Sequence, residues 1–225
     1  LPETSDIDLV IDGSERKEFL DILHQAPNLD GLHLHKKTYV TFASLYFRDG
    51  SYLEIDLIHR FDRKGIIYMS AQDVINGAAT NDQGVKFASL KHNFEYIVLF
   101  HIFNQASVPV KYQQFFNKLA KEARNEIFGY ICNKYDLYLL TIDELFHPNH
   151  RESKKLKATV LENWMNKSVF RGIHSLRYVV DLTNDLLNNP GRIITFSGVD
   201  GAGKSTVLEQ VRQTLQEKYR QKTVV

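Results

Sequence analysis

The segment SDIDLVI, residues 5–11, decides how the first part of this chain folds. Its polar and apolar residues alternate, which is typical of a β-strand with two different faces. Asp6 and Asp8 are two residues apart, so both carboxylates point to one face while Ile7 and Leu9 point to the other. Oxygen atoms are the ligands that Mg²⁺ prefers, so this pair predicts a site for that ion.

The residues that follow predict the rest of a small sheet. Residues 14–25 form a helical pattern in which Ser14 is the expected N-cap. The segments KTYVTFASLYF (37–47) and YLEIDLIHRF (52–61) are predicted strands, and the turn residues RDG lie between them. The order strand, helix, hairpin predicts a small mixed α/β sheet, in which the second hairpin strand presents Glu54 and Asp56 on one face.

These acids resemble those of the nucleotidyltransferase superfamily, which has the polymerase-β-like fold. The resemblance covers residues 1–150 loosely and implies that Asp6, Asp8 and Asp56 bind Mg²⁺ and are catalytic, with Glu54 as the reserve for Asp56. It implies transfer of a nucleotidyl group from an NTP to an acceptor hydroxyl. The Gly-Ser pair that this family carries upstream of the acids is not in the printed sequence. The alternative is that the acids face solvent at a sheet edge.

From about residue 70 the sequence pattern becomes helical. Pro109 separates a long apolar helix from an amphipathic one that we expect to be interrupted near Gly129, and Gly172 marks a possible break in the last helical stretch. The polar stretch HPNHRES is the predicted internal linker. The expected helical segments are residues 71–76, 92–106, 111–134, 141–146 and 154–187.

A second motif lies near the end, where FSGVDGAGKST (196–206) contains the pattern G-x-x-x-x-G-K-[ST]. A predicted strand (192–196) precedes it and a predicted helix (206–219) follows, which is the context of a phosphate-binding loop. Lys204 would reach the outer phosphates, and the Ser205 hydroxyl would bind Mg²⁺. The residues predicted to bind ATP or another NTP are Gly198, Asp200, Gly201, Ala202, Gly203, Lys204, Ser205 and Thr206.

Residues 192–225 resemble the start of a thymidylate kinase-like P-loop kinase. That family has a Glu before the first glycine and an Asp two residues after it; here Ser197 replaces the Glu and Asp200 matches the Asp. The resemblance implies that Asp200 contacts the acceptor substrate. A kinase also needs a second carboxylate for Mg²⁺, phosphate-clamping arginines and a lid. We therefore expect a fragment of a longer protein that lacks kinase activity by itself.

Composition limits the function classes. The 225 residues are 43% hydrophobic, which is enough for a proper core. A net charge of +1 does not favour nucleic acid as a partner. The single cysteine, Cys132, excludes an internal disulfide, so we expect a cytoplasmic protein. The longest apolar run, residues 96–103, is well short of the ~18 residues of a membrane span.

Together the patterns predict an α/β protein with an all-helical extension. The expected domains are a nucleotidyltransferase-like domain (1–90), a helical extension (91–190) and the start of a P-loop kinase domain (191–225). The expected function is that of an ATP-binding transferase, in which a thymidylate kinase-like phosphotransferase is fused to a nucleotidyltransferase-like domain that uses Mg·NTP. The partners are a nucleotide and an acceptor that the sequence does not identify. The alternative is a non-catalytic nucleotide-sensing or interaction module. The sequence does not predict the oligomeric state.

Overall fold

The structure is a computed structural model that describes residues 7–104, 106–139, 141–188, 195, 197–199 and 203–218. It has the mixed α/β architecture that the sequence predicts. The strands are β1 Ile7–Val10, β2 Leu29–Lys36, β3 Val40–Phe47, β4 Tyr52–Ile58, β5 Phe61–Arg63, β6 Ile66–Met69, β7 Ala79–Thr80 and β8 Lys86–Phe87. The helices are α1 Arg16–His24, α2 Ala71–Asn76, α3 Leu90–Phe103, α4 Val110–Lys118, α5 Lys121–Lys134, α6 Ile142–Phe146, α7 His150–Glu162, the 3₁₀ helix η1 Trp164–Asn166, α8 Ser168–Asn188, α9 Lys204–Gln213 and the π-helical turn η2 Thr214–Lys218.

The main sheet has four strands in the order β1-β4-β3-β2. The hairpin predicted from RDG is confirmed, because β3 and β4 are antiparallel and Gly50 in the turn has a φ of 80°. Strand β1 pairs with β4 in parallel, and β2 adds an antiparallel strand at the other edge. Strands β5 and β6 form a separate short hairpin.

Helix α1 covers the apolar face of this sheet. Leu20 and Leu23 of α1 pack against Ala43 and Leu57, which are both 0% exposed. The predicted Ser14 N-cap is wrong. Asp12 accepts hydrogen bonds from the backbone N–H (2.8 Å) and the hydroxyl (2.5 Å) of Ser14, so this side chain closes a turn before the helix. Glu15 stands at the N-cap, and its side chain makes no capping bond to the described backbone.

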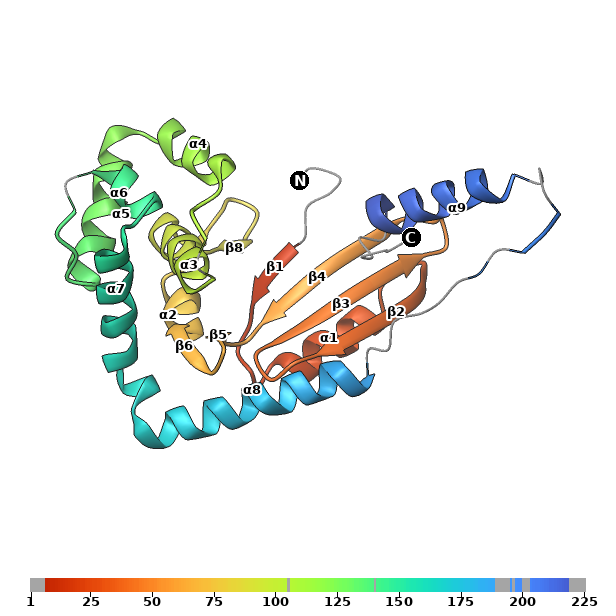
Figure 1. Ribbon diagram of the computed structural model, residues 1–225, viewed down its shortest axis with the longest axis horizontal. Helices are drawn as coiled ribbons and strands as arrows, with labels where there is room; N and C mark the ends of the chain where they lie inside the picture. Colours follow the sequence, from red (N-terminus) through yellow and green to blue (C-terminus); the bar gives the residue numbers. More distant parts are fainter. Residues whose placement is uncertain are drawn as a thin grey trace.

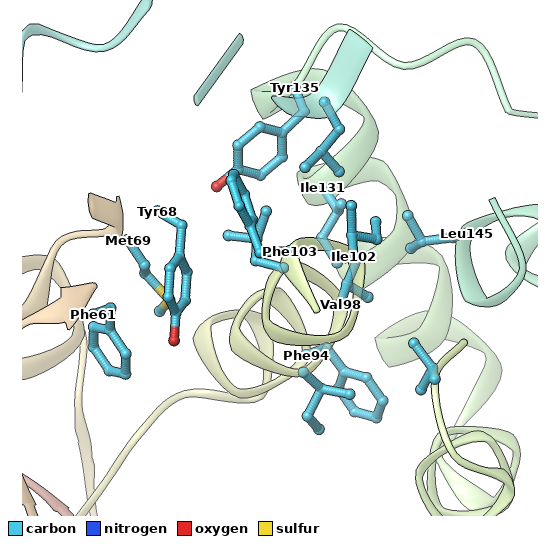
Figure 2. Close-up of a cluster of buried hydrophobic side chains, with 14 of the residues drawn as sticks. Phe61, Tyr68, Met69, Phe94, Val98, Ile102, Phe103, Ile131, Tyr135 and Leu145 are labelled. Carbon is cyan, nitrogen blue, oxygen red and sulfur yellow. The ribbon is translucent and has the colours of Figure 1, made fainter. Parts of the chain in front are cut away.

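The second core lies among the helices, together with β5, β6 and α2. Figure 2 shows Phe94, Val98 and Ile102 of α3 in one cluster with Ile131 of α5 and Leu145 of α6. Tyr68 and Met69 of β6 belong to the same cluster (Figure 2). The hairpin β5–β6 therefore packs with the helices that follow it in the sequence.

Two predicted helix breaks are wrong. Helix α5 runs without interruption through Gly129, and the break falls before it, at Leu119 and Ala120, which have extended ψ angles. Helix α8 likewise runs through Gly172. The chain instead breaks before α8, where the buried Asn166 amide donates to the Ile67 and Val160 carbonyls at 2.8 Å each. Side-chain hydrogen bonding of this kind competes with helix continuation.

Helix α8 connects the helical group to the sheet. In Figure 1 helices α3 to α7 lie to one side of the four-stranded sheet, and α8 extends from them along the sheet. Asp181 of α8 accepts hydrogen bonds from the backbone N–H (2.9 Å) and the hydroxyl (2.6 Å) of Thr38. Asp185, one turn later, pairs with Lys37 at 2.8 Å and with His35 at 3.1 Å. These bonds fix α8 against the turn between β2 and β3.

The final described segment contains α9 and η2. Of the predicted strand 192–196, only Thr195 belongs to the described residues, so the strand prediction lies outside them. Of the helices in the described ranges, none is both long enough and apolar enough to cross a membrane.

Candidate functional site

Strands β1 and β4 place two predicted site residues side by side. Asp8 is the register partner of Asp56, and partners in neighbouring strands point to the same face. Glu54, two residues before Asp56 on β4, shares that face as predicted. Asp6 lies outside the described residues. The structure thus brings together two of the three predicted metal ligands and the reserve acid, from segments almost 50 residues apart in sequence.

The face that carries these acids is polar along much of its width. Ser44 of β3 is the partner of Glu54 on one side and of His33 on the other. The Tyr52 hydroxyl donates to the Ser44 hydroxyl at 3.4 Å. The opposite face is apolar and packs on α1, so the sheet separates a core face from a face suited to polar ligands.

The pKa values of Asp8 and Asp56 are both raised, as expected for carboxylates that lie close together and are partly shielded from water. Burial, and then the charges of Asp8 and Glu54, raise the pKa of Asp56 to about 7. The Asp8 side chain reaches solvent, yet the protein around it displaces enough water to raise its pKa as well. Like charges this close resist ionising together, and a bound cation would relieve their repulsion.

The acids lie at the border between the sheet and the helical core. Val10 and Phe42, on the same face as Asp8 and Asp56, pack against the helical cluster. The charges of both acids act on Tyr96 of α3. Burial raises the pKa of the Tyr96 phenol, and the charges of Asp8 and Asp56 raise it further. Tyr96 of α3 therefore lies in the neighbourhood of the two carboxylates.

Tyr96 is not among the site residues predicted from the sequence. Tyr96 lies in an apolar helical stretch, where an aromatic side chain is expected to serve the core. It does pack in the core, where its ring centroid lies 5.4 Å from that of Phe61 with the two rings tilted by 54°. The only feature of the sequence that could have pointed to Tyr96 is its phenol hydroxyl, a polar group that needs a partner when it is buried.

The pair fits a hard divalent cation by its chemistry. Its donors are carboxylate oxygens, its pKa values are raised, and the acids face one another across adjacent strands. Within the ranges that the structure describes, no group of three His, Cys, Asp or Glu side chains is arranged to hold a metal ion. The predicted third ligand, Asp6, is outside those ranges.

The phosphate-loop residues form a second candidate site. Gly203 precedes α9 with a φ of 74°, a left-handed conformation that favours glycine, and Lys204 is the first residue of the helix. The Lys204 ammonium donates to the carbonyls of Gly198 (2.7 Å) and Val199 (2.8 Å), so this side chain reaches back to the start of the motif. Ser205 and Thr206 are exposed in the first turn of α9, where backbone N–H groups favour an anion. Asp200, Gly201 and Ala202 lie outside the described residues.

Comparisons with protein-family models, with curated proteins and with solved structures found no match to this chain. The resemblances to nucleotidyltransferases and to thymidylate kinase-like enzymes therefore remain predictions that depend on the residues themselves.

Proposed function

We propose that this chain is part of a Mg²⁺-dependent nucleotide transferase whose first site is the carboxylate pair on β1 and β4. The observation that supports this most strongly is the pairing of Asp8 with Asp56 on adjacent parallel strands, together with the raised pKa of Asp56. Acids with perturbed pKa values concentrate at functional sites, whereas solvent-facing acids at a sheet edge would keep ordinary values. Asp6 would complete the ligand set.

The residues of this site would have separate roles. Asp8 and Asp6 would hold the cation of an Mg·NTP, which supplies positive charge next to the phosphates when it is bound. Asp56 would orient the acceptor hydroxyl and accept its proton, because a carboxylate with a pKa of about 7 is a suitable general base near neutral pH. Tyr96 would form the wall beside the reacting groups and limit the access of water.

The phosphate loop would provide a second nucleotide site, belonging to a kinase-like unit. Lys204 and the backbone N–H groups of the loop would hold the outer phosphates of ATP, and Ser205 would bind Mg²⁺. Asp200 would contact an acceptor whose identity the sequence leaves open. The bonds from Lys204 to Gly198 and Val199 support this role, because they hold the ammonium against the first residues of the motif.

Calorimetric titration of Mg·ATP and of the other Mg·NTPs into the chain tests both sites. We expect Asp8→Asn to remove one binding event, Asp56→Asn to weaken that event, and Lys204→Met to remove the other. Asp21→Asn is the matched control, since it removes one exposed carboxylate from α1, the helix behind the sheet. If both sheet variants bind every Mg·NTP like the parent protein, the carboxylate site is wrong.

A sensing module remains the second candidate, because paired carboxylates can bind Mg·NTP without turning it over. Release of pyrophosphate from a radiolabelled NTP, measured against a panel of nucleotide, sugar and peptide hydroxyl acceptors, separates the two functions. A transferase loses this activity in Asp56→Asn while it retains part of its Mg·NTP affinity. A sensor shows no release with any acceptor, and its NTP binding changes assembly or stability instead.

A further inference from the structure

A cavity of about 450 Å³ lies at the other end of β1, beyond the strand residues that carry the acids. Its wall is formed by the residues that follow β1 and β4, by β6 and α2, and by η1 with the first half of α8. This volume is within the range of small-molecule sites. None of its lining residues belongs to the carboxylate pair or to the described part of the phosphate loop.

Four basic residues line the cavity: His59, Arg60, His174 and Arg177. Three of them have a buried nitrogen, Nδ1 of His59 and of His174 and Nε of Arg60, that has no partner with hydrogen-bond geometry in the described part of the chain. The backbone of Leu57 and of Met165 lies near the rings of His59 and His174, respectively. His174 is only 6% exposed. Buried polar atoms are nearly always hydrogen-bonded, so three unpartnered nitrogens around one cavity indicate a ligand.

Two of these side chains are fixed through their other atoms. His59 Nε2 is 3.0 Å from the Thr38 carbonyl oxygen, which accepts its hydrogen. Arg60 Nη2 donates to Thr38 Oγ1 and pairs with Asp62, at 3.3 Å in both cases. The unpartnered His59 Nδ1 and Arg60 Nε atoms are therefore held in place rather than free to rotate toward other partners. Such preorganised groups bind a ligand at a low entropic cost.

The charges around the cavity favour an anion. Burial lowers the pKa of His174, and the positive charges of Arg60 and Arg177 lower it further against the opposing effect of Asp62. The acid in the lining, Asp12, already accepts the hydrogen bonds of Ser14. A phosphate would be met by the N–H of Arg60 and the guanidinium of Arg177, and each imidazole Nδ1 would either accept its P–O–H or, when protonated, donate to its oxygen.

Large apolar side chains lie at the same cavity. Trp164 and Phe170 line it although they are 64% and 46% exposed, and their rings meet edge to face at 6.0 Å. Exposed aromatic residues beside a cavity are typical of ligand sites, where they cover the organic part of a ligand. The lining thus combines phosphate-binding groups with a surface for an aromatic or apolar group.

We propose that this cavity is a second ligand site, which binds a small organic phosphate through Arg60, Arg177 and His174 and covers its organic part with Trp164 and Phe170. The site is independent of the carboxylate pair and needs no divalent cation.

Calorimetric titration of phenyl phosphate into the chain, without divalent cations and at constant ionic strength, tests the proposal. We expect saturable binding that weakens about tenfold in Arg177→Gln and in Arg60→Lys, which keeps the charge beside Asp62 but removes the Nε donor. Trp164→Ala should weaken phenyl phosphate several-fold and leave the binding of inorganic phosphate unchanged. Trp164 is exposed enough for this truncation to be tolerated.

Two controls separate this site from other anion binding. Arg171→Gln removes an equal charge from the exposed surface of α8 outside the cavity and should change affinity less than twofold. Lys204→Met removes the ammonium of the phosphate loop, so the phenyl phosphate binding that persists in this variant, and that Arg177→Gln weakens, belongs to the cavity. The proposal is overturned if no saturable binding occurs, if Arg171→Gln weakens binding as much as Arg177→Gln, or if Lys204→Met abolishes it.

Discussion

Two carboxylates, one in the helical core and one on the sheet, show how the same chemical group serves different purposes. Glu95 of α3 is 0% exposed, and both of its carboxylate oxygens have hydrogen-bond or ion-pair partners. The Tyr130 hydroxyl donates to its Oε2 at 2.7 Å, the Tyr135 hydroxyl donates to its Oε1, and the Lys134 ammonium pairs with Oε1 at 2.7 Å. This network joins α3 to α5, so Glu95 is a structural acid.

Asp56 is the opposite case. It is less buried than Glu95, but its register partner is another acid and Glu54 lies on the same face. Burial and these like charges raise its pKa, whereas Glu95 has a cation and two hydroxyl donors. A buried acid that is paired with a cation and hydrogen-bond donors, such as Glu95, helps to hold the fold together. An acid that is crowded by other acids, such as Asp56, lowers the stability of the fold, and a bound cation can restore that stability.

Of the substitutions considered, Lys134→Met should lower the free energy of unfolding most, because it leaves the buried Glu95 without its cation. Burial by itself lowers the pKa of Lys134, but its hydrogen bonds with Glu95 and Tyr130 outweigh burial and raise it, so the ammonium stabilises the fold until the pH passes its raised pKa. Because the Lys134 side chain is 36% exposed, solvent screens part of this loss, and we expect the free energy of unfolding to fall by about 2.5 kcal/mol at pH 7 in urea titrations.

The matched control for this variant is Lys91→Met. Lys91 pairs with Glu126 at 2.7 Å, but both side chains are exposed, at 40% and 63%. Pairs of this kind contribute about 0–1 kcal/mol. Equal losses in the two lysine variants would contradict the structural role of Glu95.

Asp56→Asn should change stability in the other direction. The pKa of Asp56 is about 7 in the folded state against an ordinary value of 3.8, so the folded state binds this proton more tightly. The stabilisation that comes from this tighter proton binding is fully present below pH 4 and is lost as the pH rises through 7. Above pH 7 the ionised Asp56 carboxylate destabilises the fold. Without divalent cations, we expect the Asn variant to be more stable than the parent by roughly 2 kcal/mol at pH 8 and about equal at pH 4.

Urea unfolding at both pH values, with and without Mg²⁺, checks this prediction. Mg²⁺ should stabilise the parent chain at pH 8 and stabilise Asp56→Asn less. A variant that is less stable than the parent at pH 8 would show that Asp56 is a satisfied acid like Glu95.

The sequence predicted the parts of the fold that depend on local patterns. The alternation in β1 and β4 and the turn at Gly50 were enough to predict three strands of the sheet. Strand β2 was not predicted over its full length, because a register shift between Leu29 and Gly31 interrupts the alternation at its start. The β5–β6 hairpin was missed although Lys64 and Gly65, with φ angles of 51° and 75°, form the left-handed turn that such short hairpins need.

The candidate site was predictable only in part. The i, i+2 spacing of acids on one strand is visible in a sequence, so Asp8 and Asp56 could be named. The basic cavity was not, because Arg60, His174 and Arg177 come from segments that only the packing of α8 brings together. Helix breaks without Gly or Pro, such as that before α8, also depend on tertiary contacts like those of Asn166.

A smaller effect is expected from Tyr130→Phe, which removes one of the donors to Glu95. Tyr130 is partly exposed, so water can replace its hydroxyl in part. We expect a loss of about 1 kcal/mol in urea unfolding at pH 7, well below that of Lys134→Met. A loss as large as that of the lysine variant would mean that the hydroxyl donors, and not the cation, keep Glu95 in the core.

The smallest change in stability is expected from a substitution of Glu54, the acid that the sequence offered as the alternative to Asp56. Its charge raises the pKa of Asp56 less than burial and Asp8 do. Glu54→Gln should therefore lower the pKa of Asp56 by less than Asp8→Asn does, and should stabilise the chain at pH 8 by only about 0.5 kcal/mol. An NMR titration of the Asp56 side-chain carboxyl in the parent and the two variants measures both shifts. If Glu54→Gln gives the larger shift, Glu54 and not Asp8 is the main partner of Asp56, and the metal ligands should be sought along β4.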